Sequence, residues 1–413
     1  MKLKKYDERE RENYVFLKMT SKTLKLDTLL KLNRLDASKF ITRNYPMAPV
    51  GSPGSFGGTQ MAQSLLASMY TVPPTHIPNS FHCYFINAGD PEKHITYDVE
   101  NLRTGNSYIH KQVRGYQDGR LIFTSLILFS KVKDKNDAVA THPHASNAPH
   151  PLIHHLKRLR DPPRPQESLG DSNTSGNNGE IHYVPAAELF KEAVDTIGPE
   201  TVAKFPIFQK YRGLEHIKDV YDALDHYSPA EFYFPTDFYL SKEKTLKGTT
   251  STGTGTKTKL NYLFRLRPES ELITTDLSRT ITDPFKSNEQ IEPTTDYRYN
   301  YAALAFLSDR YLLLTLPYFK NTAIYSHDFG CSLDHTIYFH RVPLVNEFMV
   351  MRVANPRSLG SRHLFEGDIY DLCDGDGNGN GDDATLLSSV LQEGLAGYGN
   401  VLEQQKQQQE GTK

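Results

Sequence analysis

The sequence predicts an α+β fold in which one unit, a helix followed by an antiparallel meander of strands, occurs twice. Three observations predict it. A chain of 413 residues exceeds the size of one ordinary core. Two apolar helix-like segments each precede four strand-like segments, and short motifs recur at nearly the same spacing in both halves. The expected architecture is therefore two domains of the same kind.

The first unit begins with a helix that opens at Gly57 and Gly58. Apolar residues recur in it at helical spacing, at Met61, Leu65, Leu66 and Met69. Strand-like segments rich in β-branched and aromatic residues follow at 81–86, 94–102, 108–116 and 121–129. Asp118-Gly119, between the last two segments, is typical of a hairpin turn.

The second unit repeats this order in the C-terminal half. Residues 299–316 form a helix-like run that is apolar nearly all round, which indicates a buried helix. Four strand-like segments follow at 335–341, 347–355, 363–371 and 384–394. The two halves therefore have the same predicted order of elements.

Local motifs support a duplication. A Phe-His-x-Tyr-Phe motif contains His82, and His335 stands shortly before a Tyr-Phe pair. Asn101 follows His82 by 19 residues and Asn355 follows His335 by 20, each beginning an Asn-x-Arg motif with Thr or Ser after it. Two motifs in the same order indicate an internal repeat. A long helix wrapped by an antiparallel sheet is the hotdog arrangement, so we predict a double hotdog.

Shifts in composition place the domain boundaries, because segments rich in Gly, Ser, Thr, Asn, Pro or charge interrupt the pattern. The prediction is an N-terminal hotdog domain at 1–133, a polar insert at 134–181, a C-terminal hotdog domain at 182–402 with inserts near 241–258 and 374–383, and a disordered tail at 403–413.

Charge and cysteine content exclude several classes of protein. The 47 Lys and Arg residues against 49 Asp and Glu give a net charge of -2, which argues against a nucleic-acid partner. Three cysteines cannot form a disulfide framework, which favours a reducing compartment. Asp309 and Arg310 interrupt the longest apolar run, so we expect no transmembrane helix and no integral membrane contact.

Several segments are distinctive when they are taken together: GSFGGTQMAQSLLAS from Gly54, SFHCYFINAGDP from Ser80, ITYDVENLRTGNSYIHKQV from Ile95, LIFTS from Leu121, RYNYAALAFLSD from Arg298, SLDHTIYFH from Ser332, NPRS from Asn355 and QEG from Gln392. Together they resemble a known family, the type II acyl-CoA thioesterases, and especially their peroxisomal branch in budding yeasts. They span nearly the whole chain outside the inserts.

The resemblance implies a double-hotdog enzyme that hydrolyses fatty acyl-CoA to a free fatty acid and coenzyme A. It implies no metal and no bound cofactor, since coenzyme A is part of the substrate. It also implies a peroxisomal location and a possible homo-oligomer. The final Gly411-Thr412-Lys413 is not a peroxisomal import tripeptide, so a cytoplasmic location is the alternative.

The resemblance also implies the catalytic residues. In this family an Asp on the second central helix, a Ser or Thr just before an Asp-His pair, and a Gln in the last strand activate water. These positions fall on Asp309, Ser332 and Gln392. A carboxylate inside an apolar helix must be paired, hydrogen-bonded or protonated, so Asp309 alone could equally be a structural carboxylate. We expect Ser332 to begin a strand over residues 332–340 and Arg310 to be a poor partner for Asp309.

Two further pairs of residues are candidates for supporting roles. Gly57 and Gly58 would let a ligand approach backbone N–H groups at a helix N-terminus, which suggests an oxyanion site, although a packing role fits them as well. Asp334 and His335 resemble a catalytic pair, but neighbours on a strand face opposite sides, so we expect them to brace the site.

Other motifs and functions are weaker candidates. Residues 374–385 lack the final Glu of a calcium loop, the histidines of the 134–181 insert lack joining ligands, and the glycine-rich 248–258 segment lacks the lysine of a phosphate loop. No G-x-S-x-G motif occurs, and Cys83 is expected to be a small buried hydrophobe. The alternative functions are a non-catalytic acyl-CoA-binding module and a hotdog enoyl-CoA hydratase.

Overall fold

A computed structural model describes residues 25–49, 52, 54–131, 183–210, 214–222, 224, 228–236, 238, 259–267, 296–320, 322–323, 325–371 and 385–397. The predictions for the 134–181 insert, for the segments at 241–258 and 374–383 and for the tail lie outside these residues. So do the three motifs set aside as metal or phosphate loops, apart from residue 385 at the end of the calcium-like segment.

The N-terminal half contains the predicted helix and four strands in the predicted order. Its elements are α2 (Leu26–Leu30), β1 (Leu32–Arg34), β2 (Lys39–Thr42), α3 (Gly57–Met69), β3 (His76–Phe85), β4 (Thr96–Thr104), β5 (Tyr108–Gln117) and β6 (Arg120–Lys131). The predicted hairpin turn is confirmed, because Asp118 and Gly119 have φ values of 49° and 79°, as in a type I′ turn.

The C-terminal half contains more elements than the sequence predicted. Its elements are β7 (Tyr183–Pro185), α5 (Ala186–Ile197), α6 (Pro199–Val202), α7 (Pro206–Lys210), α8 (Leu214–Asp222), β8 (Ala230–Pro235), β9 (Leu260–Leu266), α10 (Arg298–Asp309), η4 (Leu313–Thr315), α11 (Leu316–Lys320), β10 (Phe329–Ser332), β11 (Asp334–Phe339), β12 (Met349–Leu359), β13 (Arg362–Asp371) and β14 (Thr385–Gly397). The elements from β7 to β9 were not predicted.

The single helix predicted over 299–316 is wrong at its C-terminal end. Helix α10 ends at Asp309, and a short 3₁₀ turn and α11 follow it. Pro317 lies in the first turn of α11, where its missing N–H costs nothing. Proline in the interior of a longer helix would clash with the carbonyl of Leu313, so the helix must break upstream of it. The sequence pattern does not indicate this break, because apolar residues on both sides of it are buried.

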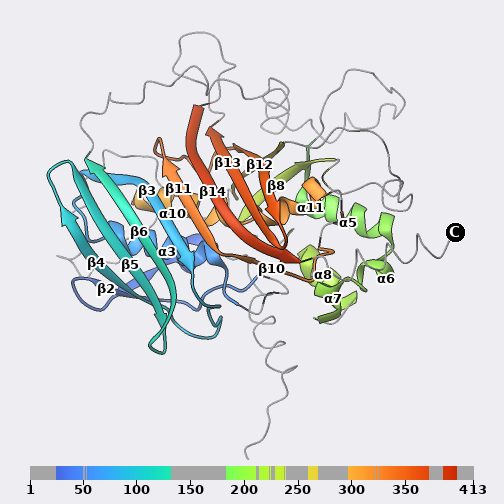
Figure 1. The fold of residues 1–413 in the computed structure, drawn as a ribbon, viewed down its shortest axis with the longest axis horizontal. Coiled ribbons are helices and arrows are strands. Elements are labelled where there is room, and N and C mark those ends of the chain that lie inside the picture. Colours follow the sequence, from blue (N-terminus) through green and yellow to red (C-terminus); the bar gives the residue numbers. More distant parts are fainter. Residues whose placement is uncertain are drawn as a thin grey trace, which may run out of the picture.

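All described strands join one antiparallel sheet that wraps two central helices (Figure 1). The strand order is β1-β2-β4-β5-β6-β3-β11-β14-β13-β12-β9-β8-β7, and β10 pairs with β14. Strands β3 and β11 meet in the middle and join the two halves. Helices α3 and α10 pack against each other behind the sheet, as the double hotdog predicts.

Strand register relates the two halves precisely. His82 of β3 pairs with Thr336 of β11, and a shift of 254 residues carries position 82 onto position 336. The same shift carries Asn101 onto Asn355, and a β-bulge occurs at that place in both β4 and β12. The bulges share a side-chain bond of 2.9 Å, in which Thr104 or Ser358 donates to the asparagine. The predicted duplication is therefore visible in the backbone.

This register corrects one detail of the predicted repeat. The shift of 254 residues carries Phe81 onto His335 and His82 onto Thr336, so the two histidines are not equivalent. A one-residue shift on a strand reverses the face that a side chain occupies. His335 is accordingly fully buried on the helix side of the sheet, and His82 is partly exposed on the other side.

The central helices approach each other closely at one end. A Cβ atom on Gly58 would lie 2.8 Å from the carbonyl oxygen of Phe306 in α10. The rings of Phe56 and Phe306 meet edge to face at 5.1 Å beside this contact. Every residue of α10 is buried, which confirms the prediction of an enclosed helix. Glycine at position 58 therefore sets the spacing of the helices at the end where Asp309 lies.

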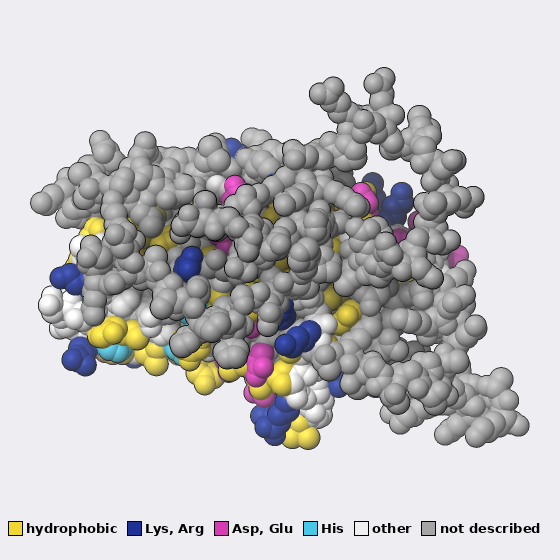
Figure 2. Space-filling view, turned by 90° about the horizontal axis from the view of Figure 1, so that it is seen from above, with side chains coloured by type: hydrophobic (Ala, Val, Ile, Leu, Met, Phe, Trp, Pro, Cys, Tyr) yellow, Lys and Arg dark blue, Asp and Glu magenta, His cyan; other side chains and the backbone are white. Residues whose placement is uncertain are grey.

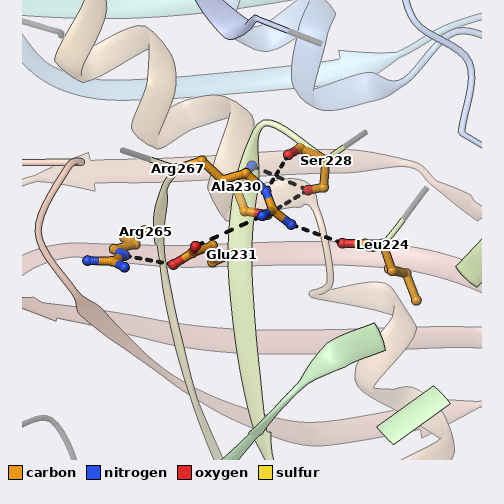
Figure 3. A network of polar contacts seen from close by, with 6 residues as sticks. All are labelled: Leu224, Ser228, Ala230, Glu231, Arg265 and Arg267. Atoms are coloured by element: carbon orange, nitrogen blue, oxygen red, sulfur yellow. Dashed lines mark hydrogen bonds and ion pairs between the residues drawn. The ribbon is translucent and has the colours of Figure 1, made fainter. Parts of the chain in front are cut away.

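An arginine network holds the start of β8 against the end of β9 (Figure 3). Arg265 donates to the Glu231 carboxylate at 2.8 Å. Arg267 donates to the backbone carbonyls of Ser228 and Leu224 at 2.9 and 3.4 Å. These bonds link two backbone carbonyls that precede β8 to the residue that follows β9, so the network joins two strands that lie outside the predicted meander.

We expect Gly119→Ala to destabilise the fold by about 1 kcal/mol, because only the positive φ opposes the new side chain. No atom lies within 4 Å of a Cβ built there. Gly119→Asn is the matched control, since asparagine tolerates this conformation. Urea denaturation of the three proteins gives the free energies of unfolding. An alanine variant as stable as the wild type would contradict the turn assignment.

Candidate active site

Asp309 is the last residue of α10 and lies where both halves of the chain meet. It is 8% exposed. Its carboxylate lies near the N-terminus of α3, because a Cβ on Gly57 would be 3.0 Å from Asp309 Oδ2. Arg310 does not pair with it, as expected; its guanidinium lies 5.6 Å from the centre of the Phe56 ring. The groups that satisfy Asp309 must therefore come from other elements.

Gln392 of β14 is the main partner of Asp309. Its amide nitrogen Nε2 donates to Asp309 Oδ1 at 2.6 Å and lies 2.9 Å from Ser332 Oγ. The side chain is fully buried, and its carbonyl oxygen Oε1 has no hydrogen-bond partner within the described part of the chain. One amide group thus holds the carboxylate and the hydroxyl in a fixed relation and leaves a free acceptor beside them.

Ser332 reaches this cluster from β10, which corrects the prediction that it begins a strand. It is the last residue of β10 and pairs with Gly394 of β14, and the next strand starts at Asp334. Strands β10 and β11 both run antiparallel to β14, and the register shifts by one residue between them at Leu333, whose N–H donates to the carbonyl of Glu393. The Ser332 hydroxyl also bonds to Asp309. The structure therefore brings Asp309, Ser332 and Gln392 together, as the resemblance implied.

The glycine pair at the start of α3 contributes both packing and a donor. The backbone N–H of Gly58 donates to the Asp309 carboxylate. Gly57 is the first residue of α3, where the helix offers no acceptor for the N–H group. Gly58 has the packing role considered in the sequence analysis, because a side chain there would meet the carbonyl oxygen of Phe306. The role of the two glycines in binding an oxyanion stays a prediction.

Asp334 and His335 face opposite sides of β11, as predicted for strand neighbours. His335 Nδ1 lies 3.8 Å from Asp309 Oδ1, too far for a hydrogen bond. His335 Nε2 lies 3.1 Å from the hydroxyl of Ser308, one residue before Asp309. Asp334 accepts the backbone N–H of Glu393 at 2.7 Å and so anchors the strand after Gln392. His335 therefore packs beside the Asp309 carboxylate, and Asp334 fixes the backbone of β14 next to Gln392.

Burial governs the protonation of the site. It raises the pKa of Asp309 to about 6, although Gln392, the Gly58 N–H and Ser332 oppose the shift by hydrogen-bonding the charged form. Burial lowers the pKa of His335 to about 3, so the imidazole is neutral at neutral pH. The Asp309–His335 contact is therefore not an ion pair, and Asp309 is a carboxylate with the basicity that a general base requires.

Two buried groups near Asp309 were not assigned to the site from sequence. The Tyr262 hydroxyl on β9 has no hydrogen-bond partner among the described residues, and burial and the Asp309 charge raise its pKa. No motif marks it. Cys83 faces the same side of the sheet, where burial and then Asp309 raise the pKa of its thiol, so it remains protonated. This agrees with the prediction of a buried hydrophobe.

The chemistry occupies only one of the two equivalent positions. His335 corresponds to Phe81 of β3, whose neighbour on β6 is Ile127. The equivalent of Ile127 in the C-terminal half is Gln392. Leu126 pairs with His82 and Leu391 pairs with the equivalent residue Thr336, so the two leucines are equivalent, and so are the residues that follow them. Two apolar side chains thus stand where the other half has an imidazole and an amide. The duplicated fold builds one polar site.

Within the described residues, no group of three or more His, Cys, Asp or Glu side chains could hold a metal ion. Across the same part of the chain, no helix is long and apolar enough to span a bilayer.

A double hotdog with one buried, hydrogen-bonded carboxylate defines the general class of this protein, and comparison with known proteins defines it further. The family described as acyl-CoA thioesterase matches residues 257–395, and the acyl-CoA thioesterase N-terminal domain matches residues 45–130. The tesB protein of Mycobacterium avium subs paratuberculosis has the same fold, with a TM-score of 0.50, 14% identity, and coverage of 90% of this chain and 98% of that one.

Two named relatives are similar in sequence. Peroxisomal acyl-coenzyme A thioester hydrolase 1 of Saccharomyces cerevisiae is 36% identical over 383 residues, which cover 91% of this chain and 95% of that protein. Human acyl-coenzyme A thioesterase 8 is 32% identical over 142 residues, or 34% of this chain and 39% of that one. The chain belongs to the acyl-CoA thioesterase family.

We expect Asp309→Asn to stabilise the protein at pH 8 by roughly 3 kcal/mol, the free energy of a pKa raised from 3.8 to about 6. A raised pKa favours the protonated form in the folded state. The stability that Asp309 contributes is thus present below its unfolded pKa of 3.8 and is lost as the pH rises through about 6. The gain of the variant should therefore disappear towards pH 4.

Thermal unfolding across pH 4 to 8 measures this difference. Asp195→Asn is the matched control, since Asp195 is exposed on α5 and its replacement removes a charge without relieving burial. An Asp309→Asn variant less stable than the wild type at pH 8 would show that the hydrogen bonds outweigh the cost of burial.

Proposed function

We propose that the chain hydrolyses fatty acyl-CoA to a free fatty acid and coenzyme A, with Asp309 as the general base. Its membership of the acyl-CoA thioesterase family makes it an acyl-CoA hydrolase. The observation that carries the mechanism is the cluster of Asp309, Gln392 and Ser332, in which a buried carboxylate is held by two side chains from β14 and β10.

The proposed reaction is a direct attack by water. Asp309 removes a proton from water while the water oxygen bonds to the thioester carbonyl carbon, which gives a tetrahedral oxyanion. The oxyanion then collapses, the carbon–sulfur bond breaks, and the proton on Asp309 passes to the departing coenzyme A thiolate. The carboxylate is thereby regenerated, and the products are the fatty acid and free coenzyme A.

Gln392 and Ser332 act by orienting the base and the water. The bond from Gln392 Nε2 fixes the plane of the carboxylate, and the free Oε1 can accept a hydrogen bond from the attacking water. Fixed geometry of this kind lowers the entropic part of the barrier. We assign the oxyanion to the N-terminus of α3, where Gly57 supplies a backbone N–H and no side chain that would block approach.

The proposed location and partners follow the similarity to known proteins. The Saccharomyces cerevisiae relative is named a peroxisomal enzyme, and this supports the peroxisome as the compartment of this chain. Acyl-CoA is the proposed partner in the active site. We also propose that the chain self-associates, because the outer face of its sheet carries exposed apolar side chains.

The two alternative functions predict different sites. A non-catalytic acyl-CoA-binding module requires no oriented base, and an enoyl-CoA hydratase requires an imidazole able to exchange protons with substrate. His335 is fully buried and its pKa is lowered to about 3, so it is a weak base. The Asp309 cluster favours hydrolysis over both alternatives.

We expect Asp309→Asn to reduce release of free thiol from acyl-CoA by on the order of 100-fold or more, because the variant lacks a base. Gln392→Ala and Ser332→Ala should lower kcat by on the order of 10-fold or more, because they leave the carboxylate in place but unoriented. The wild-type kcat/KM should fall as the pH drops below about 6, where Asp309 becomes protonated.

The assay uses a panel of acyl-CoA esters of short to very long chain, with Asp195→Asn as the control. Circular dichroism verifies that each variant is folded. If wild type and Asp309→Asn both bind acyl-CoA but release no thiol, the chain is a binding module. If Asp309→Asn hydrolyses at the wild-type rate, the base is another residue.

We also propose that the reaction needs neither a metal ion nor a bound cofactor. The Asp309 carboxylate already accepts hydrogen bonds from Gln392, Ser332 and Gly58, and these occupy the positions that a metal would need. Dialysis against EDTA should therefore leave thiol release unchanged, and added zinc or magnesium should not raise it. Loss of activity on dialysis, with recovery on addition of one metal, would contradict this proposal.

A further inference from the structure

His335 is a fully buried histidine whose ring has one bonded and one unbonded nitrogen. Its exposed fraction is 0%. Nε2 lies 3.1 Å from the hydroxyl of Ser308, whereas Nδ1 has no hydrogen-bond partner within the described part of the chain. Figure 2 shows other histidine side chains at the molecular surface, where water can bond to both ring nitrogens. A buried nitrogen without a partner is costly, so it indicates a role other than packing.

The hydrogen-bond network determines which nitrogen of His335 carries the proton. Ser308 Oγ lies 3.0 Å from the carbonyl oxygen of Ala305, and because a carbonyl oxygen only accepts, the hydroxyl must donate to it. A hydroxyl has one hydrogen, so Ser308 can only accept from the imidazole. Nε2 is therefore protonated, and Nδ1 carries a lone pair. The ring is neutral near neutral pH, since burial lowers the pKa of His335 to about 3.

The unbonded nitrogen of His335 lies next to the reacting carboxylate. Nδ1 is 3.8 Å from Asp309 Oδ1, the oxygen that accepts the amide N–H of Gln392 at 2.6 Å. Two groups that only accept cannot bond to each other, which explains the long distance. A proton on Oδ1 changes this, because the carboxyl group can then donate to Nδ1 after an approach of about 1 Å. The contact is thus open while Asp309 is ionised and can close when it is protonated.

Packing alone does not require an imidazole at this position. The equivalent residue of the N-terminal half is Phe81, which is also 0% exposed. A phenyl ring fills a similar space and has no polar atom to remove from water. The imidazole stands in the half of the chain whose helix carries Asp309. Its position therefore favours a role in the chemistry of the carboxylate.

We propose that His335 Nδ1 accepts a hydrogen bond from Asp309 while Asp309 holds the proton taken from water. This role rests on the proposed function and adds an acceptor to its mechanism. When the O–H bond of water breaks, an Oδ1–H bond forms and is directed at Nδ1, and no proton passes to the imidazole. When the oxyanion collapses, the proton leaves Oδ1 for the coenzyme A thiolate. Because Nδ1 bonds to the acid and not to the resting carboxylate, it stabilises the intermediate more than the bound substrate, which raises kcat.

The groups around this pair keep their protonation states near neutral pH. The Cys83 thiol on β3 and the Tyr262 hydroxyl on β9 stay protonated, because burial and the charge of Asp309 raise their pKa values. The charge of Arg310 reaches Asp309 and lowers its pKa, and a guanidinium keeps its proton at every pH used here. Three uncharged donors bond to the carboxylate: Gln392, Ser332 and the N–H of Gly58. A change of pH between 5 and 8 therefore acts on the contact through Asp309.

His335→Phe removes the acceptor and keeps a ring that the fold already accepts at Phe81. At pH 8, where Asp309 is ionised, kcat for acyl-CoA should fall by about 10-fold or more and KM should stay within about 3-fold. His335→Asn keeps an oxygen near the position of Nδ1, so its kcat should return to within about 3-fold of the wild type. A His335→Phe variant that is folded by circular dichroism and keeps the wild-type kcat would contradict the proposal.

Ser308→Ala tests the assigned tautomer. Without the hydroxyl, Nε2 loses its acceptor, and the proton can move to Nδ1 and donate to the Asp309 carboxylate. A hydrogen bond to the charged form lowers the pKa of Asp309, so the pH below which kcat/KM falls should shift downward and kcat should fall. Ser68→Ala is the matched control, because Ser68 is fully buried in α3 and donates to the Leu65 carbonyl at 2.7 Å in the same way. A pH profile that is the same in both variants would overturn the assignment.

The ¹⁵N resonance of His335 Nδ1 reports the contact without substrate. In protein labelled with ¹⁵N-histidine, the signal lost in His335→Phe identifies this residue. As the pH falls from 8 to 5, Asp309 takes up a proton near its pKa of about 6 and should donate to Nδ1. The Nδ1 resonance should therefore move upfield with a midpoint near 6, and in Asp309→Asn it should not respond to pH. A wild-type resonance that ignores pH, or two nitrogens that titrate together, would overturn the proposal.

The thiol assay and the NMR titration distinguish this role from the proposed function. A wild type that releases no thiol from acyl-CoA would overturn the proposed function, and the catalytic role of His335 with it. A wild type that releases thiol while its Nδ1 resonance ignores pH would overturn the role of His335 alone.

Discussion

The cost of burying one carboxylate is the constraint on which the site depends. Asp309 ends a helix whose every residue is buried, so its charge must be met by groups from other elements. Gln392, Ser332 and the N–H of Gly58 meet it from β14, β10 and α3. The meeting point of three elements is thus defined by hydrogen bonds to a single side chain. The same burial makes that side chain a stronger base, so destabilisation and basicity have one cause.

Duplication of the hotdog unit separated the tasks of its two halves. Both bulged strands keep the same asparagine geometry, and the sheet register runs unbroken through the junction. The inward positions do not match, since Phe81 and Ile127 replace the polar pair His335 and Gln392. The N-terminal half supplies the glycine end of its helix to the site. A single chain can therefore have a symmetric scaffold and an asymmetric site.

Hydrophobic pattern predicted the two central helices, eight of the strands and the hairpin at Gly119. It could not predict the end of α10, because the apolar run continues past Asp309 through the 3₁₀ turn and into α11. It also missed β8 and β9, which lie on either side of the polar segment at 241–258. Asp309 was recognisable as a charge in an apolar helix. Ser332 and Gln392 were not, because a hydroxyl or amide on a strand is ordinary until register places it beside a carboxylate.

The pairing of β3 with β11 has a consequence for synthesis of the chain on the ribosome. About 250 residues separate the two strands, so β3 emerges long before the strand that completes it. During that interval β3 is the unpaired edge of an otherwise finished N-terminal sheet, and such edges recruit other strands. Closure over so long a separation is also slow. The nascent chain therefore depends on protection of this edge until translation of the second half ends.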